Sequence, residues 1–221
     1  MVNLLPNLEG RLGAAGLRWS GRLVSNLVVR APWTWPLLRP FVDRFFSNRA
    51  LAWDRITDAG SARHLAPLSA AALYVKPHPE RVLDLGTGTG EGALLMAREF
   101  PAASVRGVDM SSEMIRIAAR KVGLDPTGRV AFKVADASNL PYDDDSFDLV
   151  TQLNMPPFVA ELARVVRPGG SVVIATTAGP RTPAYARPDT IAAAFARRGF
   201  NEVARGSAAD GEFWVGRRSR R

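Results

Sequence analysis

From residue 81 onward, short apolar runs alternate with stretches whose apolar residues recur at helical spacing. Continuous runs of Val, Leu and Ile are typical of strands that are buried on both faces of a parallel sheet. Five such strands are predicted, at 82–85, 105–108, 130–134, 147–153 and 171–176. Helices are predicted near 91–99, after Ser111 or Ser112, at about 157–166 and at 190–198. Repeated strand–helix units predict a parallel sheet with helices on both faces.

The C-terminal part of the chain has a different pattern. Two further strands, near 201–205 and 212–216, are close enough in sequence to form a hairpin across 208–211. The turn Pro168-Gly169-Gly170 is expected to separate the helix at 157–166 from the fifth strand. At the other end of the domain, residues 54–74 are predicted to form one or two short helices, with Pro67 as a break or a start.

The first 50 residues form a separate, aromatic-rich region. Its large aromatic residues are Trp19, Trp33, Trp35, Phe41, Phe45 and Phe46. Prolines at 32, 36 and 40 argue against one long helix, although Leu38, Val42, Phe45 and Phe46 could share one face of a short helix. This arm could anchor the protein at a membrane surface, or it could pack over the domain or a partner subunit. We therefore predict an arm, 1–50, and one domain, 51–221.

The charge of the chain is concentrated at its two ends. The net charge is +8 over 221 residues, of which 1–50 contribute +5, 51–210 contribute zero and 211–221 contribute +3. Basic ends can attract nucleic acid or anionic lipid, or simply remain solvated. Because no nucleic-acid recognition motif accompanies them, we do not expect a nucleic-acid partner. No apolar run approaches the ~20 residues that a membrane span needs, and no signal-peptide pattern is expected.

The residue composition also limits the possible chemistry. The chain has no Cys and only two His residues, His64 and His78, so neither a disulfide framework nor a thiolate or His-rich metal site is expected. A reducing, cytoplasmic environment fits this composition.

The most informative segment runs from Arg81 to Gly90, in which a strand containing Asp84 enters a turn with glycines at 86, 88 and 90. In a parallel sheet, ligands bind beyond the carboxyl ends of the strands. Asp84, Asp109, Asp136 and Asn154 all lie at or just past such ends. A dinucleotide fingerprint, Gly-x-Gly-x-x-Gly, fails when counted from Gly86 and starts two residues late when counted from Gly88. Negative charge around the turn disfavours a pyrophosphate and favours a cation.

Four collinear stretches resemble the motifs of class I S-adenosylmethionine-dependent methyltransferases. They are Val82-Leu-Asp-Leu-Gly-Thr-Gly-Thr-Gly90, Val105-Arg-Gly-Val-Asp-Met-Ser111, the segment from Ala135 to Asp148, and Glu161-Leu-Ala-Arg-Val-Val-Arg-Pro-Gly-Gly170. The subgroup that they resemble most includes the ubiquinone/menaquinone biosynthesis methyltransferases. The resemblance covers about 75–217. It implies a Rossmann-like α/β fold with a mostly parallel seven-stranded sheet, an antiparallel C-terminal hairpin and helices on both faces.

The resemblance also implies S-adenosylmethionine as the cofactor. The cofactor-binding residues that it implies are Asp84, Gly86, Thr87, Gly88, Gly90, Asp109, Met110, Asp136 and Ala137. Asp84 would face the cationic methionine part, Asp109 would accept from both ribose hydroxyls, and Asp136 with the Ala137 amide would bind adenine. Asp136 could instead only cap a turn.

The methyl acceptor is less well defined by the sequence. Candidate acceptor-pocket residues are Gln152, Asn154, Phe158, Trp53 and Tyr185, with Arg181 near the last of these. Asn154-Met-Pro-Pro-Phe158 resembles the amine-binding motif of some methyltransferases, but Met155 splits it, and the two prolines could simply start a helix. Trp53 and part of 19–56 are expected to close the site as a lid.

These observations predict methyl transfer to a small or lipid-like acceptor, with possible peripheral membrane contact through 1–50 and a homodimer as a further expectation. Two alternatives remain open at this point. The chain could be a non-catalytic S-adenosylmethionine-binding or membrane-associated regulator, or an NAD(P)-dependent oxidoreductase, which the glycine register disfavours.

Overall fold

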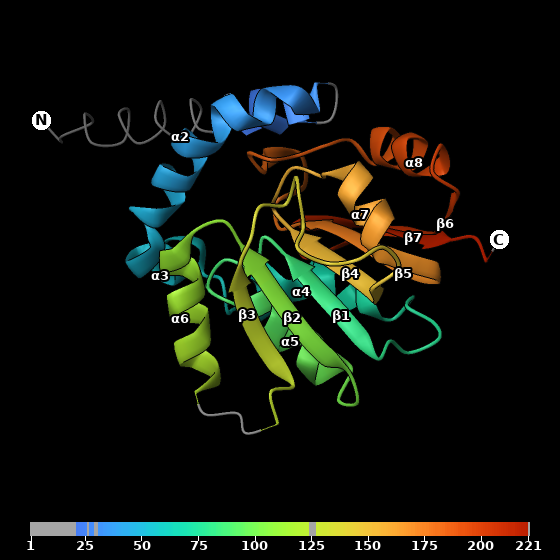
Figure 1. Cartoon of the computed structure of the whole chain (residues 1–221), viewed down its shortest axis with the longest axis horizontal. Helices are drawn as coiled ribbons and strands as arrows, with labels where there is room; N and C mark the ends of the chain where they lie inside the picture. Colours follow the sequence, from blue (N-terminus) through green and yellow to red (C-terminus); the bar gives the residue numbers. More distant parts are fainter. Residues whose placement is uncertain (1–20, 26, 29–30, 124–126, 221) are drawn as a thin grey trace, which may run out of the picture.

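The fold is built around one seven-stranded sheet, in a computed structural model that describes residues 21–25, 27–28, 31–123 and 127–220 (Figure 1). The strands are β1 (Arg81–Leu85), β2 (Ser104–Asp109), β3 (Val130–Val134), β4 (Phe147–Leu153), β5 (Val166–Thr176), β6 (Phe200–Ala208) and β7 (Gly211–Arg218). Their order is β3-β2-β1-β4-β5-β7-β6. Strands β1 to β5 are parallel, and β7 is antiparallel to both β5 and β6. The predicted fold class and C-terminal hairpin are confirmed.

Helices cover both faces of the sheet (Figure 1). Those of the domain are α3 (Trp53–Thr57), α4 (Ala62–Ala72), α5 (Glu91–Glu99), α6 (Ser112–Val122), α7 (Val159–Val165) and α8 (Pro188–Ala196). Successive strand residues point to opposite faces, so Val82 packs with α4 and α5 whereas Leu83 packs with α7 and α8. Ser111 caps α6 by accepting a hydrogen bond from the Met114 amide, as predicted.

The N-terminal part of the chain is more helical than its prolines suggested. Helix α2 (Trp35–Ser47) runs through both Pro36 and Pro40. Pro36 lies in the first turn, where a missing N–H costs nothing because those donors have no helical partner. Pro40 is exposed and lies inside the helix. The short helix expected around Leu38 and Val42 is therefore present and contains both prolines, because packing of its inner face outweighs one missing hydrogen bond.

Two boundaries also differ from prediction. Helix α4 passes through Pro67, and the break between α3 and α4 lies instead at Asp58, which has a left-handed conformation with φ +53°. Strand β5 begins at Val166, so Pro168-Gly169-Gly170 lies within it. The pairing of β4 with β5 jumps from Phe147–Val166 to Leu149–Ser171, which makes these residues an irregularity in the strand.

Helix α2 lies along the edge of the molecule at which the parallel strands end (Figure 1). The short helical turns η1 (Pro32–Thr34) and η2 (Ala50–Ala52) flank it, and a third, η3 (Gly179–Arg181), follows β5. The arm therefore crosses the edge where the sequence places the candidate site. Within the described residues, no helix combines the length and the apolar character needed to cross a membrane.

Candidate cofactor and acceptor site

The glycine turn leaves β1 and forms the floor of the site. Gly86, Gly88 and Gly90 have φ values of +67°, +52° and +92°. At Gly86 an added Cβ would lie 2.3 Å from the Met155 Sδ, so a larger residue fits neither the backbone nor the space. The Thr87 amide donates to the Val108 carbonyl at 2.9 Å, which fixes the turn against β2. The loop therefore presents main chain without a Cβ at Gly86, Gly88 and Gly90, at the sheet edge.

Asp84 braces this loop from below. Its carboxylate accepts hydrogen bonds from the hydroxyls of Thr87 at 2.6 Å and Thr151 at 2.9 Å, and the residue is 2% exposed. Gly92, the second residue of α5, lets that helix approach, since a Cβ there would lie 2.8 Å from Asp84 Oδ2. Burial raises the pKa of Asp84 to about 6. The sequence led us to expect Asp84 at the mouth of the site, but the structure places its carboxylate inside the fold.

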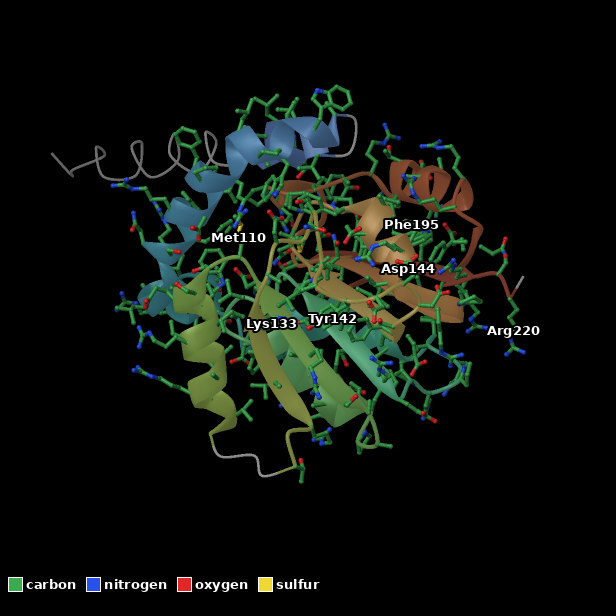
Figure 2. All side chains as sticks on the ribbon, in the orientation of Figure 1. Met110, Lys133, Tyr142, Asp144, Phe195 and Arg220 are labelled. Atoms are coloured by element: carbon green, nitrogen blue, oxygen red, sulfur yellow. The ribbon has the colours of Figure 1, made fainter. Side chains whose placement is uncertain are left out.

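Asp109 lies at the carboxyl end of β2, beside the glycine turn. Its Oδ2 accepts from the Gly88 amide at 3.0 Å and its Oδ1 from the Ser111 amide at 2.9 Å. Burial raises the pKa of this carboxyl group above its usual range. Each of these two oxygens can accept one further hydrogen bond. Asp109 can therefore bind two neighbouring hydroxyl groups of a ligand. Met110 follows at the end of the sheet that faces α2 (Figure 2).

Asp136 follows β3 and is held by the arm. Trp35 Nε1 donates to its Oδ1 at 2.9 Å, and Arg39 Nε lies 3.4 Å from its Oδ2. The amide and hydroxyl of Ser138 both donate to Oδ1 at 2.8 Å. Asp136 therefore caps a local turn, the alternative left open by the sequence, and also faces the arm. A surface hollow of about 340 Å³ adjoins it, lined by Trp35, Pro36, Arg39, Pro40, Asp43, Asp136 and Ser138.

The arm encloses the candidate site from above. Trp35 is 4% exposed and packs edge-on against Phe158, with ring centroids 5.0 Å apart. Met110, Ala137 and Met155 pack against the same small cluster. These contacts join the arm to the ends of β2, β3 and β4.

Helix α3, which directly follows the arm, lies over the glycine turn. Trp53 Nε1 is 3.8 Å from the position of a Cβ built on Gly88, and its ring packs edge-on against Phe46. Asp54 accepts a hydrogen bond from the Thr89 hydroxyl and pairs with Lys121 at 2.6 Å. Trp53 therefore lies beside the predicted cofactor loop rather than in a separate acceptor pocket.

Gln152 lies near the end of β4 and Asn154 directly follows the strand. The side chains of both residues form hydrogen bonds with nearby loops. Gln152 Nε2 donates to the Met155 carbonyl at 2.9 Å, while its buried Oε1 has no hydrogen-bond partner among the described residues. Asn154 has φ +60°, and its Oδ1 accepts from the Thr177 amide at 2.8 Å. Its Nδ2 donates to the Thr177 hydroxyl at 3.1 Å. Asn154 thus fixes the loop after β4 to the loop after β5.

The other acceptor candidates are separated in space. Phe158 is buried against Trp35, and Tyr185 donates from its hydroxyl to Glu212 Oε2 at 3.1 Å. Burial and the contact with Glu212 raise the pKa of the Tyr185 phenol. Arg181 lies 3.7 Å from Asp210. The structure therefore unites the predicted cofactor residues more closely than the predicted acceptor residues.

The sequence analysis did not predict a role at the site for Arg39 or Thr151, and it did not predict that Met155 contacts Gly86. Trp35 was noted only as an aromatic residue of the arm. The short helix predicted from the sequence was recognised from Leu38 and Val42, and extending it back by one turn would have placed Trp35 on the same face.

The residues present fit an adenosyl cofactor with a charged amino-acid part. The glycine main chain adjoins Asp109, and among the described residues Asp136 Oδ2 has only a long ion pair with Arg39. Acceptor oxygens at the ends of β2 and β3 suit hydroxyl and amino donors. No group of three or more potential metal ligands occurs in the described ranges.

Known proteins with similar sequences are methyltransferases. Residues 82–170 match a family described as a methyltransferase domain. A ubiquinone/menaquinone biosynthesis C-methyltransferase of Geotalea daltonii is 37% identical over 110 residues, which cover 46% of this chain and 47% of that protein. A demethylmenaquinone methyltransferase of Roseiflexus castenholzii is 35% identical over 153 residues, covering 65% and 63%. The aligned part thus spans less than two thirds of either relative.

The fold has the same kind of neighbours. A magnesium protoporphyrin IX methyltransferase from Synechocystis PCC 6803, solved with bound SAH, superposes with a TM-score of 0.66 and 18% identity, covering 82% of this chain and 100% of that one. The similarity in sequence and fold confirms the expected fold class and the expected cofactor, S-adenosylmethionine. Residues 82–170 of this chain thus match a methyltransferase domain in sequence, and the fold around them is that of class I S-adenosylmethionine-dependent methyltransferases.

Proposed function

We propose that this protein transfers a methyl group from S-adenosylmethionine to a ring carbon of a quinone-type, lipid-like acceptor in its reduced, hydroquinone form. The ring carbon gains the methyl group and loses its proton, and S-adenosylhomocysteine leaves. The observation that carries the proposal is the pair of carboxylates at the ends of the neighbouring strands β2 and β3, with Asp109 bonded to the glycine loop and Asp136 to Trp35 of the arm. The names of the related quinone-pathway C-methyltransferases support the acceptor class and the carbon acceptor.

The cofactor, when bound, supplies a methyl group on a positively charged sulfur. In this proposal the main chain at Gly86, Thr87, Gly88 and Gly90 receives the methionine part. Asp109, next to Met110, accepts from the ribose. Asp136 Oδ2 and the Ala137 amide recognise adenine. Asp84 acts through the loop, because its carboxylate is bound to Thr87 and Thr151.

The contribution of the protein to the reaction is to position the acceptor and to exclude water. Apolar side chains of Met155, Phe158 and Trp35 surround the end of β4 and suit a flat, apolar acceptor. The free Gln152 Oε1 is the polar atom at this end of β4 that could accept a hydrogen bond from such a ring. Gln152 is therefore our preferred acceptor-binding residue, whereas Asn154 braces the loop.

We further propose that the arm, residues 1–50, acts with Trp53 as a lid over the domain, 51–221. The contacts of Trp35 with Asp136 and of Asp54 with Thr89 support this role. Deleting 1–50 should raise the dissociation constant of S-adenosylhomocysteine, measured by calorimetry, without unfolding the domain. An unchanged dissociation constant in a folded deletion variant would contradict the lid.

A membrane contact through 1–50 belongs to the same proposal, because a lipid-like acceptor resides in a membrane. A cytoplasmic location and a homodimer stay predictions from the sequence.

The reaction is tested by incubating the protein with S-adenosylmethionine and a demethylated quinone that a chemical reductant keeps in its hydroquinone form, and by measuring the mass of the product. The expected result is a gain of one methylene unit that Asp109→Ala abolishes while the fold is retained. Binding of S-adenosylmethionine without any methylated product would favour a regulator. Binding of NADH in place of S-adenosylmethionine would contradict the proposal.

A further inference from the structure

Helix α2 presents two different apolar faces. Its inner face, with Trp35, Leu38 and Val42, belongs to the cluster that covers the cofactor site. Its outer side carries Trp33, in η1, followed by Leu37 and Phe41 at intervals of four residues. These three side chains, which we call the outer stripe, are 76%, 75% and 77% exposed. Large apolar residues gathered on an exposed surface are characteristic of interaction sites.

Basic side chains lie on the same part of the chain as the outer stripe. Arg44, three residues after Phe41, and Arg49 are exposed, whereas Arg39 pairs with Asp136. The first 50 residues carry a net charge of +5, whereas 51–210 are neutral. The outer stripe is thus an apolar surface within the positively charged arm, residues 1–50.

We propose that the outer stripe of α2 inserts into the headgroup region of an anionic lipid bilayer. Exposed Trp and Phe with flanking Arg is the combination that binds at such an interface, where indole rings occupy the headgroup level. Each Arg near an anionic leaflet strengthens binding roughly fivefold. The proposal rests on the proposed function in that the acceptor is lipid-like. It adds that the helix covering the site is also the helix that meets the membrane.

This arrangement has a consequence for the acceptor. Trp35, on the inner face of α2, contacts Asp136 and Phe158, whereas Trp33 and Leu37 face outward. A bilayer that holds the outer stripe therefore holds the rim of the site next to the lipid phase. An acceptor with a lipid tail can then reach the end of β4 without crossing water.

The test uses the full-length protein and sedimentation with vesicles of phosphatidylcholine alone or mixed with phosphatidylglycerol. The variant carries Trp33→Ser, Leu37→Gln and Phe41→Gln, all at exposed positions. Leu73→Ser is the matched control, because Leu73 is 72% exposed but follows α4. Arg44→Gln probes the charge. We expect binding to mixed vesicles to fall at least tenfold in the stripe variant and severalfold in Arg44→Gln, with the control unchanged.

Three results would overturn the inference. The first is equal vesicle binding by the wild type and the stripe variant, and the second is equal loss in the Leu73→Ser control. The third is a wild type that does not bind vesicles but whose self-association, measured by light scattering, disappears in the stripe variant; that face would then join two copies of the chain. Affinity for S-adenosylhomocysteine and transfer to a short-chain, water-soluble quinone are measured in parallel. Loss of this affinity and of this transfer in the wild type would contradict the proposed function, whatever the vesicle result.

Discussion

Trp35 Nε1 donates a hydrogen bond of 2.9 Å to Asp136 Oδ1, across 101 residues of sequence. Oδ1 also accepts two bonds from Ser138, so the orientation of this carboxylate is fixed from two sides. Within the part of the chain that the structure describes, the second oxygen, Oδ2, faces only Arg39, at 3.4 Å. Trp35 therefore positions Asp136 so that Oδ2 is the atom available to a ligand.

Replacing Trp35 by Phe tests this positioning role. Phe retains an aromatic ring against Phe158 but loses the N–H donor. A hydrogen bond to a charged group contributes about 1.5–3 kcal/mol, so we expect the dissociation constant of S-adenosylhomocysteine to rise by roughly tenfold or more. Calorimetry measures the constant, and Trp33→Phe, at an exposed position, is the control. Equal affinity in both variants would show that Trp35 serves packing alone.

Arg39 should have the opposite effect, because it occupies the oxygen that Trp35 leaves available. The Arg39→Gln variant removes a partly exposed ion pair, which contributes less than about 1 kcal/mol. We expect binding of S-adenosylhomocysteine to tighten by no more than about fivefold at low salt, and the gain to vanish at high salt. Weaker binding at low salt would mean that Arg39 itself contacts the cofactor.

The central sheet could be predicted from the sequence because its apolar runs are buried on both faces. Strand β4 was predicted with its observed bounds, and β1 to β3 within one residue at either end. The arm was harder to predict, since Pro36 and Pro40 weaken local helix preference and only packing on the distant Asp136 and Phe158 restores it. Asp84 and Asn154 were placed at the correct strand ends, but sequence position does not determine which way a side chain turns. Their partners, Thr151 and Thr177, come from other strands or loops.

Asp84 should make stability depend on pH. Its folded pKa of about 6 lies above the usual 3.8, so its stabilising contribution is present below the unfolded pKa and is lost as pH rises through the folded value. Between about pH 5 and pH 8 this amounts to roughly 1.5 kcal/mol of unfolding free energy. Urea denaturation should show that the unfolding free energy of the wild type falls by roughly 1.5 kcal/mol more than that of Asp84→Asn over this pH range.

Other groups titrate in the same window, and the comparison between variants removes them. The pKa of Asp109 is also raised by burial, and that of His64 is lowered by burial, which acts in the opposite direction. Both groups are the same in wild type and Asp84→Asn. Parallel stability curves for the two proteins would show that Asp84 keeps an ordinary pKa.

Gly86→Ala should destabilise the cofactor loop. Alanine at φ +67° costs about 1 kcal/mol, and the new Cβ would lie 2.3 Å from the Met155 Sδ. Gly128→Ala is the control, since its φ is +58° and nothing lies within 4 Å of its Cβ position. Urea denaturation should show a larger loss of unfolding free energy for Gly86→Ala than for the control. Adding Met155→Ala to Gly86→Ala should recover only the part of the loss by which the two glycine variants differ. Equal losses at both glycines would exclude the steric contribution of Met155.

Asn154 is predicted to be a structural brace, not an acceptor ligand, and its variants can separate these roles. Asn154→Gly keeps the backbone free to adopt φ +60° but loses the bonds to Thr177, at a cost of about 1–3 kcal/mol. Asn154→Ala should lose about 1 kcal/mol more, because alanine is strained at positive φ. Thr177→Ala removes the same hydroxyl contact from the opposite side, so Asn154→Gly and Thr177→Ala together should cost less than the sum of the two. A ligand-binding asparagine would behave differently: Asn154→Gly would raise the acceptor KM without lowering the urea midpoint, and Thr177→Ala would leave KM unchanged. Denaturation and steady-state kinetics on the three variants therefore decide whether this residue touches the acceptor.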